Sequence, residues 1–401
     1  MIKLLNLLVA LFFTNDVFNC ILKIALITDG IAPYIIGGMQ KHSYYLAKYF
    51  AKHQVYVDLI HYNDSQFDIH ALDIFSIEEK KYIHSIVINF PTFIRFPGHY
   101  LYKSYQYSCL AYEQIKPHLH EYDFIYTKGF AGWKLINEKK RGNNKCCAIG
   151  VNFHGYEMFQ YAPEIKSKLQ QQILKPFVKQ ISKKADIVFS YGTNISKIIE
   201  GIGVDKKNII EIPSGVETEI INVSISNHTE PQTKFVFLGR AERRKGIIEL
   251  NNALNYLIAH SFDFMFEFIG PIPEQLKIVH HRITYHGETR DKQVIKQLLE
   301  KTDVLVCPSW SEGFPNVILE AMACGLAIIA TDVGAISDMV SSANGWLIQP
   351  FNQQQLQEAM HEAIAKNNLS SKKEQSLQLM NQKFNWDIIS SRLINEISRI
   401  H

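Results

Sequence analysis

The sequence has few cysteines, a small net charge and none of the common metal-binding signatures. Its six cysteines have the spacing of neither a metal site nor a disulfide framework, so we expect reduced thiols in a cytosolic protein. The formal charge of +3 gives no support for nucleic-acid binding, because such proteins usually carry a dense basic face. The patterns Asp-x-Asp, His-Glu-x-x-His and Cys-x-x-Cys are all absent, and we therefore predict no metal site.

The N-terminal apolar run, from Leu4 to Phe13, is too short to span a bilayer, which needs about 20 residues. It is similar to the core of a signal peptide, but no small-x-small cleavage site follows it. Three interpretations of residues 1–20 stay open. They form an apolar extension before the first strand, a weak membrane-surface anchor or an export signal.

What the chain does contain is a repeated alternation of short apolar runs and helical periodicity. With 401 residues, 47% of them hydrophobic, it should form two or three domains. The predicted strands lie within residues 21–30, 55–62, 85–90, 123–128, 146–153, 186–192, 234–240, 265–271, 283–288, 303–309, 326–332 and 345–350, and the segment 208–218 ends the first half. The predicted helices are 39–52, 246–260, 291–301, 316–324, 352–366 and a long segment from about 372 to 400.

This alternation predicts an α/β fold with two doubly wound, Rossmann-like parallel sheets facing across a cleft. We place the first domain at 21–218, a polar, turn-rich linker at 219–233 and the second domain at 234–380. Residues 381–401 form a C-terminal helix that is able to cross back to the first domain. Ligands of such sheets bind beyond the carboxyl ends of the strands, so the chemistry should lie in the loops there.

The most unusual stretch is SWSEGFPNVILEAMACG, residues 309–325. Pro315 and Asn316 suit the start of a helix, with asparagine as its cap, and Gly325 suits its end. Such a helix would be apolar on every side and buried, so Glu320 would need a partner for its charge. The vicinal hydroxyls of a bound ribose would satisfy it. The alternative is a structural glutamate paired with an arginine.

Two features beside Glu320 extend this interpretation. The N–H groups at Phe314–Asn316 would make an electropositive pocket for a phosphate or a polar sugar. Glu312, in the loop just before, faces the same space and is able to accept hydrogen bonds from sugar hydroxyls. One short segment would therefore hold the ribose, the phosphates and the sugar of a sugar nucleotide.

The two glutamates, embedded in SEGFPNVILEAMACG, resemble the signature of retaining glycosyltransferases with the two-domain GT-B architecture, the "group 1" or family-four class. The resemblance runs from about residue 22 to 390. It includes GRAERRKG (239–246), the Gly37–Gly38 loop, NFHGYE (152–157) and IPSGVE (212–217), in which Ser214 and Glu217 depart from the family pattern. The C-terminal motif is specific, whereas the N-terminal ones are individually weak.

The resemblance implies transfer of a hexose-type sugar from a nucleotide-diphosphate donor to an acceptor hydroxyl, with retention at the anomeric carbon. Arg240 and Lys245 would stabilise the charge of the departing diphosphate, His154 would lie near the transferring sugar, and Glu312 would contact sugar hydroxyls. These four are the expected catalytic residues. The expected donor-binding residues are Gly37, Gly38, Arg240, Lys245, Glu312, Gly313, Phe314, Pro315, Asn316 and Glu320.

Each of these positions also has an ordinary structural interpretation. Arg240 and Lys245 would then be surface cations, Gly37 and Gly38 an ordinary turn, and His154 a structural histidine. We expect Arg243 and Arg244 to be solvated.

The resemblance implies no cofactor, with the nucleotide sugar as co-substrate, and we expect no metal requirement because cations and a helix N-terminus supply the positive charge. The second domain would bind the donor, with base contacts from backbone groups near His286–Gly287. The first would bind a glycan or lipid-linked acceptor, with roles for Glu157 and the aromatic stretch 90–108, whose alternative is simple packing. The expected location is the cytoplasm, with peripheral contact at the inner membrane surface.

Three rival functions belong to other classes. One is a non-catalytic protein that binds nucleotide sugars, and another is a nucleotide-sugar epimerase of the same architecture. The third, suggested by residues 1–20, is an exported carbohydrate-binding protein.

Overall fold

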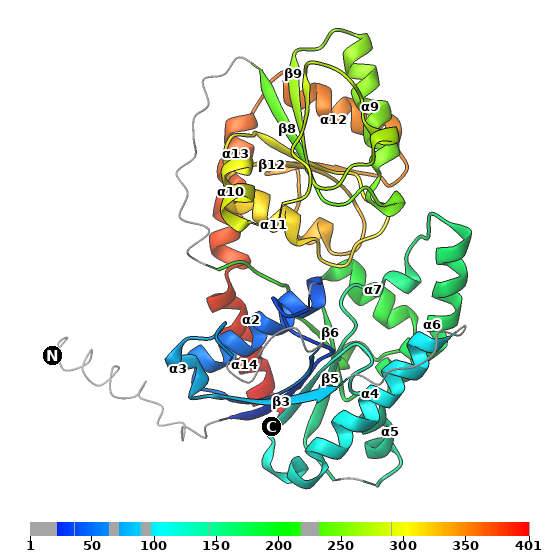
Figure 1. Cartoon of the computed structure of the whole chain (residues 1–401), viewed down its shortest axis with the longest axis vertical. Helices are drawn as coiled ribbons and strands as arrows, with labels where there is room; N and C mark the ends of the chain where they lie inside the picture. Colours follow the sequence, from blue (N-terminus) through cyan, green and yellow to red (C-terminus); the bar gives the residue numbers. More distant parts are fainter. Residues whose placement is uncertain are drawn as a thin grey trace, which may run out of the picture.

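The computed structural model describes residues 22–35, 37–63, 72–89, 98–143, 145–217, 232–289 and 291–400. Residues 1–20 and most of the predicted linker lie outside these ranges, as do residues 90–97 of the aromatic stretch. Two α/β domains are stacked along the long axis of the molecule, with the N-terminal domain below and the C-terminal domain above in Figure 1.

The N-terminal domain is built on a seven-stranded parallel sheet of order β3-β2-β1-β4-β5-β6-β7. The strands are β1 (Lys23–Ile27), β2 (Tyr56–Asn63), β3 (Ile83–Asn89), β4 (Phe124–Lys128), β5 (Ala148–Asn152), β6 (Ile187–Ser190) and β7 (Ile209–Glu211). Apolar residues cover both faces of β1, because Ile24 and Leu26 belong to one buried cluster while Ala25 and Ile27 belong to another. This two-sided burial explains why the strands appear in the sequence as continuous apolar runs.

Helices connect these strands. They are α2 (Gly38–Lys52), α3 (Ile77–Lys80), α4 (His99–Ile115), α5 (Trp133–Lys140), α6 (Ile165–Lys184) and α7 (Thr193–Gly201), with 3-10 turns η1 (Lys116–Glu121), η2 (Glu157–Phe159) and η3 (Lys206–Asn208).

The C-terminal domain has a six-stranded parallel sheet of order β10-β9-β8-β11-β12-β13. Its strands are β8 (Thr233–Leu238), β9 (Phe264–Ile269), β10 (Ile283–Tyr285), β11 (Val304–Cys307), β12 (Ala327–Thr331) and β13 (Gly345–Ile348). Its helices are α9 (Ile247–Ala259), α10 (Lys292–Glu300), α11 (Asn316–Ala323), α12 (Gln353–Ile364) and α13 (Leu369–Lys383), with 3-10 turns η4 (Arg243–Lys245), η5 (Glu274–Leu276) and η6 (Ile336–Asp338). The two doubly wound parallel sheets confirm the predicted fold class.

The C-terminal helical segment differs from the prediction, because it is two helices. A break at Phe384 and Asn385 separates α13 from α14 (Trp386–Ile400), and there Asn385 pairs with Val216 of the N-terminal domain. The α14 helix packs on α2, where Trp386 stacks on Tyr45 and Tyr49 with ring centroids 5.5 and 5.8 Å away. Figure 1 shows α13 beside the upper domain and α14 beside the lower one. The chain end therefore ties the two domains together.

Both sheets reverse their strand order at one point, between β1 and β4 in the first and between β8 and β11 in the second. Ligands of open α/β sheets bind outside the carboxyl ends of the strands at such points. The loops after β1, β8 and β11 carry Gly37, Lys245 and Glu312, respectively. The fold thus brings the sequence motifs of both domains to two facing switch points.

Five of the six cysteines lie in the described ranges. Within the described ranges, Cys109, Cys146, Cys147, Cys307 and Cys324 are all free.

Candidate functional site

The two domains touch through the loops that follow β5 and β11. A Cβ atom added to Gly155 would lie 2.1 Å from Cα of Gly313, so the two backbones are in direct contact. Gln160 bridges the same loops, since its side-chain amide donates to the carbonyl of Glu312 (2.6 Å) and accepts from its N–H (3.2 Å). Two glycines and one amide therefore join the loops that carry His154 and Glu312.

His154 follows β5 in a left-handed backbone conformation, with a φ of 63°. The side chain of Asn152 fixes this turn by accepting the His154 N–H (3.0 Å), and the Tyr191 hydroxyl bonds Nδ1 of the ring (2.7 Å). The other ring nitrogen, Nε2, lies beside Gly38, where an added Cβ would be 3.1 Å away. Gly38 thus leaves room for the histidine between the domains.

The His154 imidazole is neutral near physiological pH. Burial, with a smaller contribution from Lys128, lowers the pKa of His154 to about 3. Such a ring donates a hydrogen bond through one nitrogen and accepts one through the other, so it suits contact with a hydroxyl better than neutralisation of an anion.

A buried polar group lies beneath His154, and sequence reasoning missed it. Lys128 at the end of β4 is fully buried and donates to Nδ1 of His42 (2.9 Å) and Oδ1 of Asn152 (3.1 Å). Burial lowers the pKa of Lys128 well below its ordinary value. The signal that would have identified it is a lysine at the end of the apolar run FIYTK, at the same sheet edge as His154.

Glu312 is buried and lies among cations. Its Oε1 accepts from Nζ of Lys245 (2.6 Å) and from Oγ of Ser309 (2.7 Å), while Nη1 of Arg244 lies 3.7 Å from Oε2. Two predicted site residues, Lys245 and Glu312, are therefore bonded to each other. The opposite charge of Lys245 compensates for the hydration that the Glu312 carboxylate loses on burial.

The prediction that Arg243 and Arg244 are solvated is wrong. The Arg243 guanidinium lies 3.8 Å from the ring centroid of Trp310 and forms two 2.8 Å hydrogen bonds with Glu249. Although burial acts in the opposite direction, nearby carboxylates, Glu312 first among them, raise the pKa of Arg244.

Arg240, by contrast, is largely exposed. Its side chain is 72% exposed and pairs with Glu242 at 2.9 Å. It is free to swing toward a ligand more easily than the other three cations of this loop.

The prediction that Glu320 is buried inside a wholly apolar helix is also wrong. Its side chain is 27% exposed, and its Oε1 accepts a hydrogen bond from Nζ of Lys41 in the other domain (2.6 Å). The residues that pack inside are Ile318, Leu319, Ala321, Met322 and Ala323. Glu320 thus lies on the face of α11 turned to the N-terminal domain, and its partner is a lysine rather than an arginine.

The start of α11 also needs correction. Pro315 occupies the N-cap position and Asn316 is the first helical residue, with no side-chain capping bond. Proline has no N–H, so Pro315 cannot contribute to the predicted set of donors at Phe314–Asn316. Gly325 takes a φ of 76° and its N–H bonds the carbonyl of Met322, as its predicted role at the helix end requires.

Two cavities border this junction. The first, about 310 Å³, contains the Lys41–Glu320 pair and is also lined by Tyr45, Glu217, Lys292 and other residues of α10. Glu217, a departure from the family pattern, accepts hydrogen bonds from Lys48 (2.5 Å) and Tyr45 (3.2 Å) of α2. The Glu217 carboxylate therefore joins the β7 loop to α2 at the wall of this cavity.

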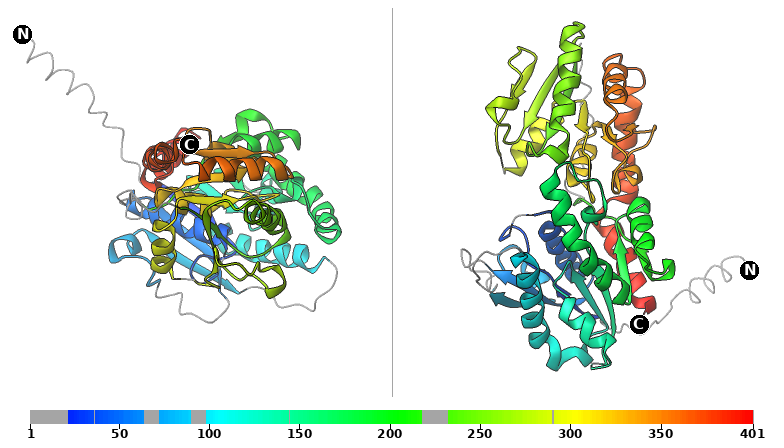
Figure 2. Two further views of the ribbon diagram at one scale, coloured as in Figure 1. Left: turned by 90° about the horizontal axis from the view of Figure 1, so that it is seen from above. Right: turned by 90° about the vertical axis from the view of Figure 1, so that its right-hand side faces the viewer.

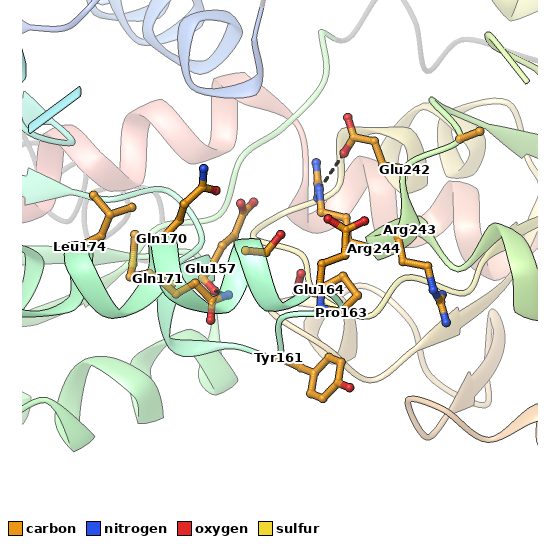
Figure 3. A pocket seen from close by; sticks show the side chains of 14 residues that line it. Glu157, Tyr161, Pro163, Glu164, Gln170, Gln171, Leu174, Glu242, Arg243 and Arg244 are labelled. Carbon is orange, nitrogen blue, oxygen red and sulfur yellow. Dashed lines mark hydrogen bonds and ion pairs between the residues drawn. The ribbon is translucent and has the colours of Figure 1, made fainter. Parts of the chain in front are cut away.

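The second cavity, about 570 Å³, lies between α6 and the arginine loop of the C-terminal domain. Figure 3 shows Glu157, Gln170 and Gln171 from the N-terminal domain facing the loop that carries Glu242 and Arg244, which are hydrogen-bonded to each other. At its rim, Tyr161 packs against Trp310 and Phe351 of the other domain, with centroids 5.1 and 4.5 Å away. The size suits a small ligand or part of a larger one.

The remaining predicted positions have simple placements. Gly37 is the N-cap residue of α2, and Phe314 packs against Tyr191 across the interface (5.4 Å between centroids). His286 and Gly287 follow β10, where the Gly287 carbonyl accepts from Gly270. Of the aromatic stretch, Tyr107 is buried, whereas Tyr100 and Tyr102 on α4 are exposed.

In the described ranges, no three His, Cys, Asp or Glu residues are grouped to hold a metal ion, and no helix is long and apolar enough to cross a bilayer.

Comparison with known proteins gives two family matches. The model described as glycosyl transferases group 1 matches residues 232–366, and that described as glycosyltransferase family 4 matches residues 36–220. Together they cover both domains.

Individual relatives agree with these matches. A Bacillus subtilis (strain 168) protein, TuaC, named for teichuronic acid biosynthesis, is 38% identical over 135 residues, which is 33% of this chain and 34% of TuaC. The uncharacterized glycosyltransferase MJ1178 of Methanocaldococcus jannaschii is 26% identical over 80% of this chain and 86% of its own length. Among solved structures, sucrose-phosphate synthase from Thermosynechococcus elongatus superposes with a TM-score of 0.73 at 19% identity, covering 94% of this chain and 99% of that one, which shows a shared fold.

Proposed function

Because this chain belongs to the group 1 glycosyltransferases, we propose that it transfers a hexose-type sugar from a nucleotide-diphosphate donor to an acceptor hydroxyl, with retention of anomeric configuration. The observation that carries the proposal is the meeting of His154, Glu312 and Lys245 where the two domains touch. The ring of His154 lies beside Gly313, and the next residue in the chain direction toward β11 is Glu312, whose carboxylate is bound to Lys245.

The diphosphate of the donor binds beside η4 and the start of α11. Negative charge grows on it as the glycosidic bond breaks, and fixed cations stabilise that charge without moving. Lys245 is held in place by Glu312, and Arg240 is exposed enough to turn onto the phosphates. The N-terminus of α11 adds partial positive charge.

The ribose of the donor binds to Glu320. In the structure this carboxylate is paired with Lys41. Both partners are partly exposed, so the pair is weak, roughly 0–1 kcal/mol. Two hydroxyls of a ribose replace the lysine at small cost.

His154 contacts the transferring sugar. When the Tyr191 hydroxyl donates to Nδ1, the proton of the neutral ring lies on Nε2, which lies beside Gly38. From there the ring donates a hydrogen bond to a sugar hydroxyl. Asn152 holds the backbone that aims it.

Retention is best explained by attack of the acceptor on the same face from which the diphosphate leaves. Glu312 is a poor nucleophile here, because its Oε1 already accepts two hydrogen bonds. The departing phosphate oxygen takes the proton of the acceptor hydroxyl as the new glycosidic bond forms. Glu312 instead accepts hydrogen bonds from donor-sugar hydroxyls through its other oxygen.

The acceptor, a glycan or a lipid-linked sugar, enters through the 570 Å³ cavity. Glu157 and Gln171 offer hydrogen-bonding groups to its hydroxyls, and Tyr161 offers an exposed ring on which a sugar stacks. No metal ion is needed, because Lys245, Arg244 and the helix N-terminus supply the positive charge.

A thermal-shift screen of UDP-, GDP-, ADP- and dTDP-sugars tests the donor site. The correct donor at 100 times its Kd stabilises the native state by about 2.7 kcal/mol. Arg240→Ala should weaken binding roughly tenfold or more, since a hydrogen bond to a charged group contributes about 1.5–3 kcal/mol, and Glu320→Ala should weaken it as well. The matched control is Arg141→Ala, because Arg141 is also exposed (67%) and paired with a nearby glutamate, Glu138.

Product analysis by NMR then separates the alternatives. Transfer with the donor's anomeric configuration is the expected result. Inversion would refute retention, a new nucleotide sugar without acceptor would indicate an epimerase, and tight binding without turnover would indicate a sensor. If no donor stabilises the protein, or if both variants bind as the wild type does, the site assignment fails.

A further inference from the structure

The α6 helix has an unusual composition for the surface of this protein. Its twenty residues, IKSKLQQQILKPFVKQISKK, contain six lysines and no acidic residue. The whole chain, by comparison, has a formal charge of only +3. Within the described part of the chain, none of these lysines pairs with a carboxylate. The helix is therefore a concentrated positive surface.

Three large apolar side chains on α6 are exposed. Ile165 is 90% exposed, Leu169 64% and Ile173 45%. They are spaced by four residues, which places them on one face of the helix. The opposite face is buried through Val178 and Ile181, so the apolar stripe is not part of the domain core.

Lysines border the exposed stripe on both sides. At 100° per residue, Lys168 and Lys179 fall on one edge of the stripe and Lys166 on the other. An apolar face with lysines at its margins is typical of a helix that lies in the headgroup region of a membrane, with its apolar side chains in the acyl boundary. Anionic lipid headgroups match the charge of such a helix.

We propose that α6 docks this protein onto an anionic membrane surface, with Ile165, Leu169 and Ile173 inserted between the headgroups. The helix lies at the right-hand side of the molecule in Figure 1, and that side faces the viewer in the right panel of Figure 2. Nothing in this step requires a donor or an acceptor, so its test is independent of the proposed transfer.

The position of α6 gives the docking a consequence for the acceptor. The face of α6 opposite the apolar stripe, through Ser167, Gln170, Gln171 and Leu174, lines the 570 Å³ cavity. A docked α6 therefore places this cavity on the side of the helix away from the bilayer, about one helix diameter (roughly 10 Å) above it, a distance that the sugar chain of a lipid-linked acceptor is able to span. This second point rests on the proposed function.

Co-sedimentation of the full-length protein with vesicles tests the docking. We compare vesicles of phosphatidylethanolamine with 30% phosphatidylglycerol, as the stated anionic composition, with vesicles of phosphatidylcholine. The protein should bind the anionic vesicles and lose binding as salt is raised. The triple variant Ile165→Gln, Leu169→Gln, Ile173→Gln should bind on the order of 100-fold more weakly, with an unchanged melting temperature.

Charge variants and matched controls complete the test. Lys166→Gln with Lys168→Gln should weaken binding to anionic vesicles roughly 25-fold, since each lysine near such a surface contributes roughly a fivefold factor. Lys206→Gln with Lys301→Gln removes the same charge at exposed positions outside α6, and Val279→Gln removes a fully exposed apolar side chain in the other domain. Both controls should bind as the wild type does.

A local measurement separates α6 from residues 1–20, which also contain an apolar run. Amide hydrogen exchange at residues 165–176 should slow when anionic vesicles are added. The proposal is overturned if the triple variant sediments like the wild type, if exchange at 165–176 is unaffected, or if the stripe instead mediates self-association with no vesicle binding.

Discussion

The close approach of the two domains makes Gly155 the most informative position to change. A Gly155→Ala side chain would place Cβ 2.1 Å from Cα of Gly313 and 2.8 Å from its backbone nitrogen, closer than real Cβ contacts occur. Both neighbouring atoms belong to the backbone, so no side-chain rotation relieves the overlap. Either the loops shift or the domains separate.

The size of the effect follows from the cost of overpacking. Forcing a methyl group into a filled contact costs about 1–3 kcal/mol. The contact lies between domains, so separation of the domains relieves it without unfolding either sheet. The population of the assembled site then falls roughly 5- to 150-fold. We expect kcat/KM for transfer to fall by the same factor, with little change in the unfolding free energy.

Three measurements check this reasoning. Steady-state transfer with the donor identified by the thermal screen gives kcat/KM, denaturant unfolding gives stability, and small-angle scattering reports domain separation. The control is Gly201→Ala at the end of α7, where an added Cβ meets nothing within 4 Å. Gly313→Ala should behave like Gly155→Ala. The double variant should cost less than the sum of the two, because both substitutions create an overlap at the same contact and one separation of the domains relieves both. Wild-type kcat/KM in Gly155→Ala, with unchanged scattering, would refute the claim that this contact is part of the active arrangement.

Other predictions concern the charges of the site. Lys41→Gln frees the Glu320 carboxylate, so donor affinity should rise by up to about fivefold, measured by calorimetry; binding more than fivefold weaker would show that Lys41 itself holds the donor. The lowered pKa of His154, about 3, means that the unfolded chain takes up a proton that the folded chain does not as pH falls below about 6.5. The free energy of unfolding, measured by denaturant titration, should therefore decrease from pH 7 to pH 5, and it should decrease less in His154→Gln than in the wild type. An equal decrease in both proteins would contradict the lowered pKa of His154. Transfer should continue at an unchanged rate in excess EDTA, and a more than tenfold loss restored by one divalent metal would refute metal independence.

The fold was predictable because it depends on patterns that survive in a single sequence. Strands buried on both faces appear as continuous apolar runs, and every predicted strand segment overlaps one of the observed strands. The break between α13 and α14 was not predictable from helical periodicity, since it depends on Asn385 pairing with Val216 of the other domain. That contact joins positions far apart in the chain and leaves no local signal.

The sequence indicated which positions of the candidate site would lie together, but not the contacts that they make. His154, Glu312, Lys245 and Gly38 lie at the domain junction as expected. Their partners were hidden, because Tyr191 and Lys128 have no motif spacing relative to His154, and the part of Asn152 in the NFHGYE motif became visible only through its contacts. The prediction that Glu320 is buried was wrong, because its apolar neighbours in the sequence turn toward the core while Glu320 itself faces the other domain.

The charged side chains of the candidate site are paired with one another, and this affects how any variant is to be interpreted. Lys245 pairs with Glu312, Lys41 with Glu320 and Arg240 with Glu242. The diphosphate of the proposed donor would therefore have to displace these carboxylates from the cations it binds. The Lys41–Glu320 and Arg240–Glu242 pairs are partly exposed, so water or a ligand replaces either partner easily. Glu312, by contrast, is buried, and removal of Lys245 would leave its carboxylate without the nearest cation. Loss of one partner of such a pair costs about 3–5 kcal/mol of stability. A loss of activity in Lys245→Ala would thus combine folding and catalysis, and Arg240, exposed and outside that buried pair, reports on the phosphate contact alone.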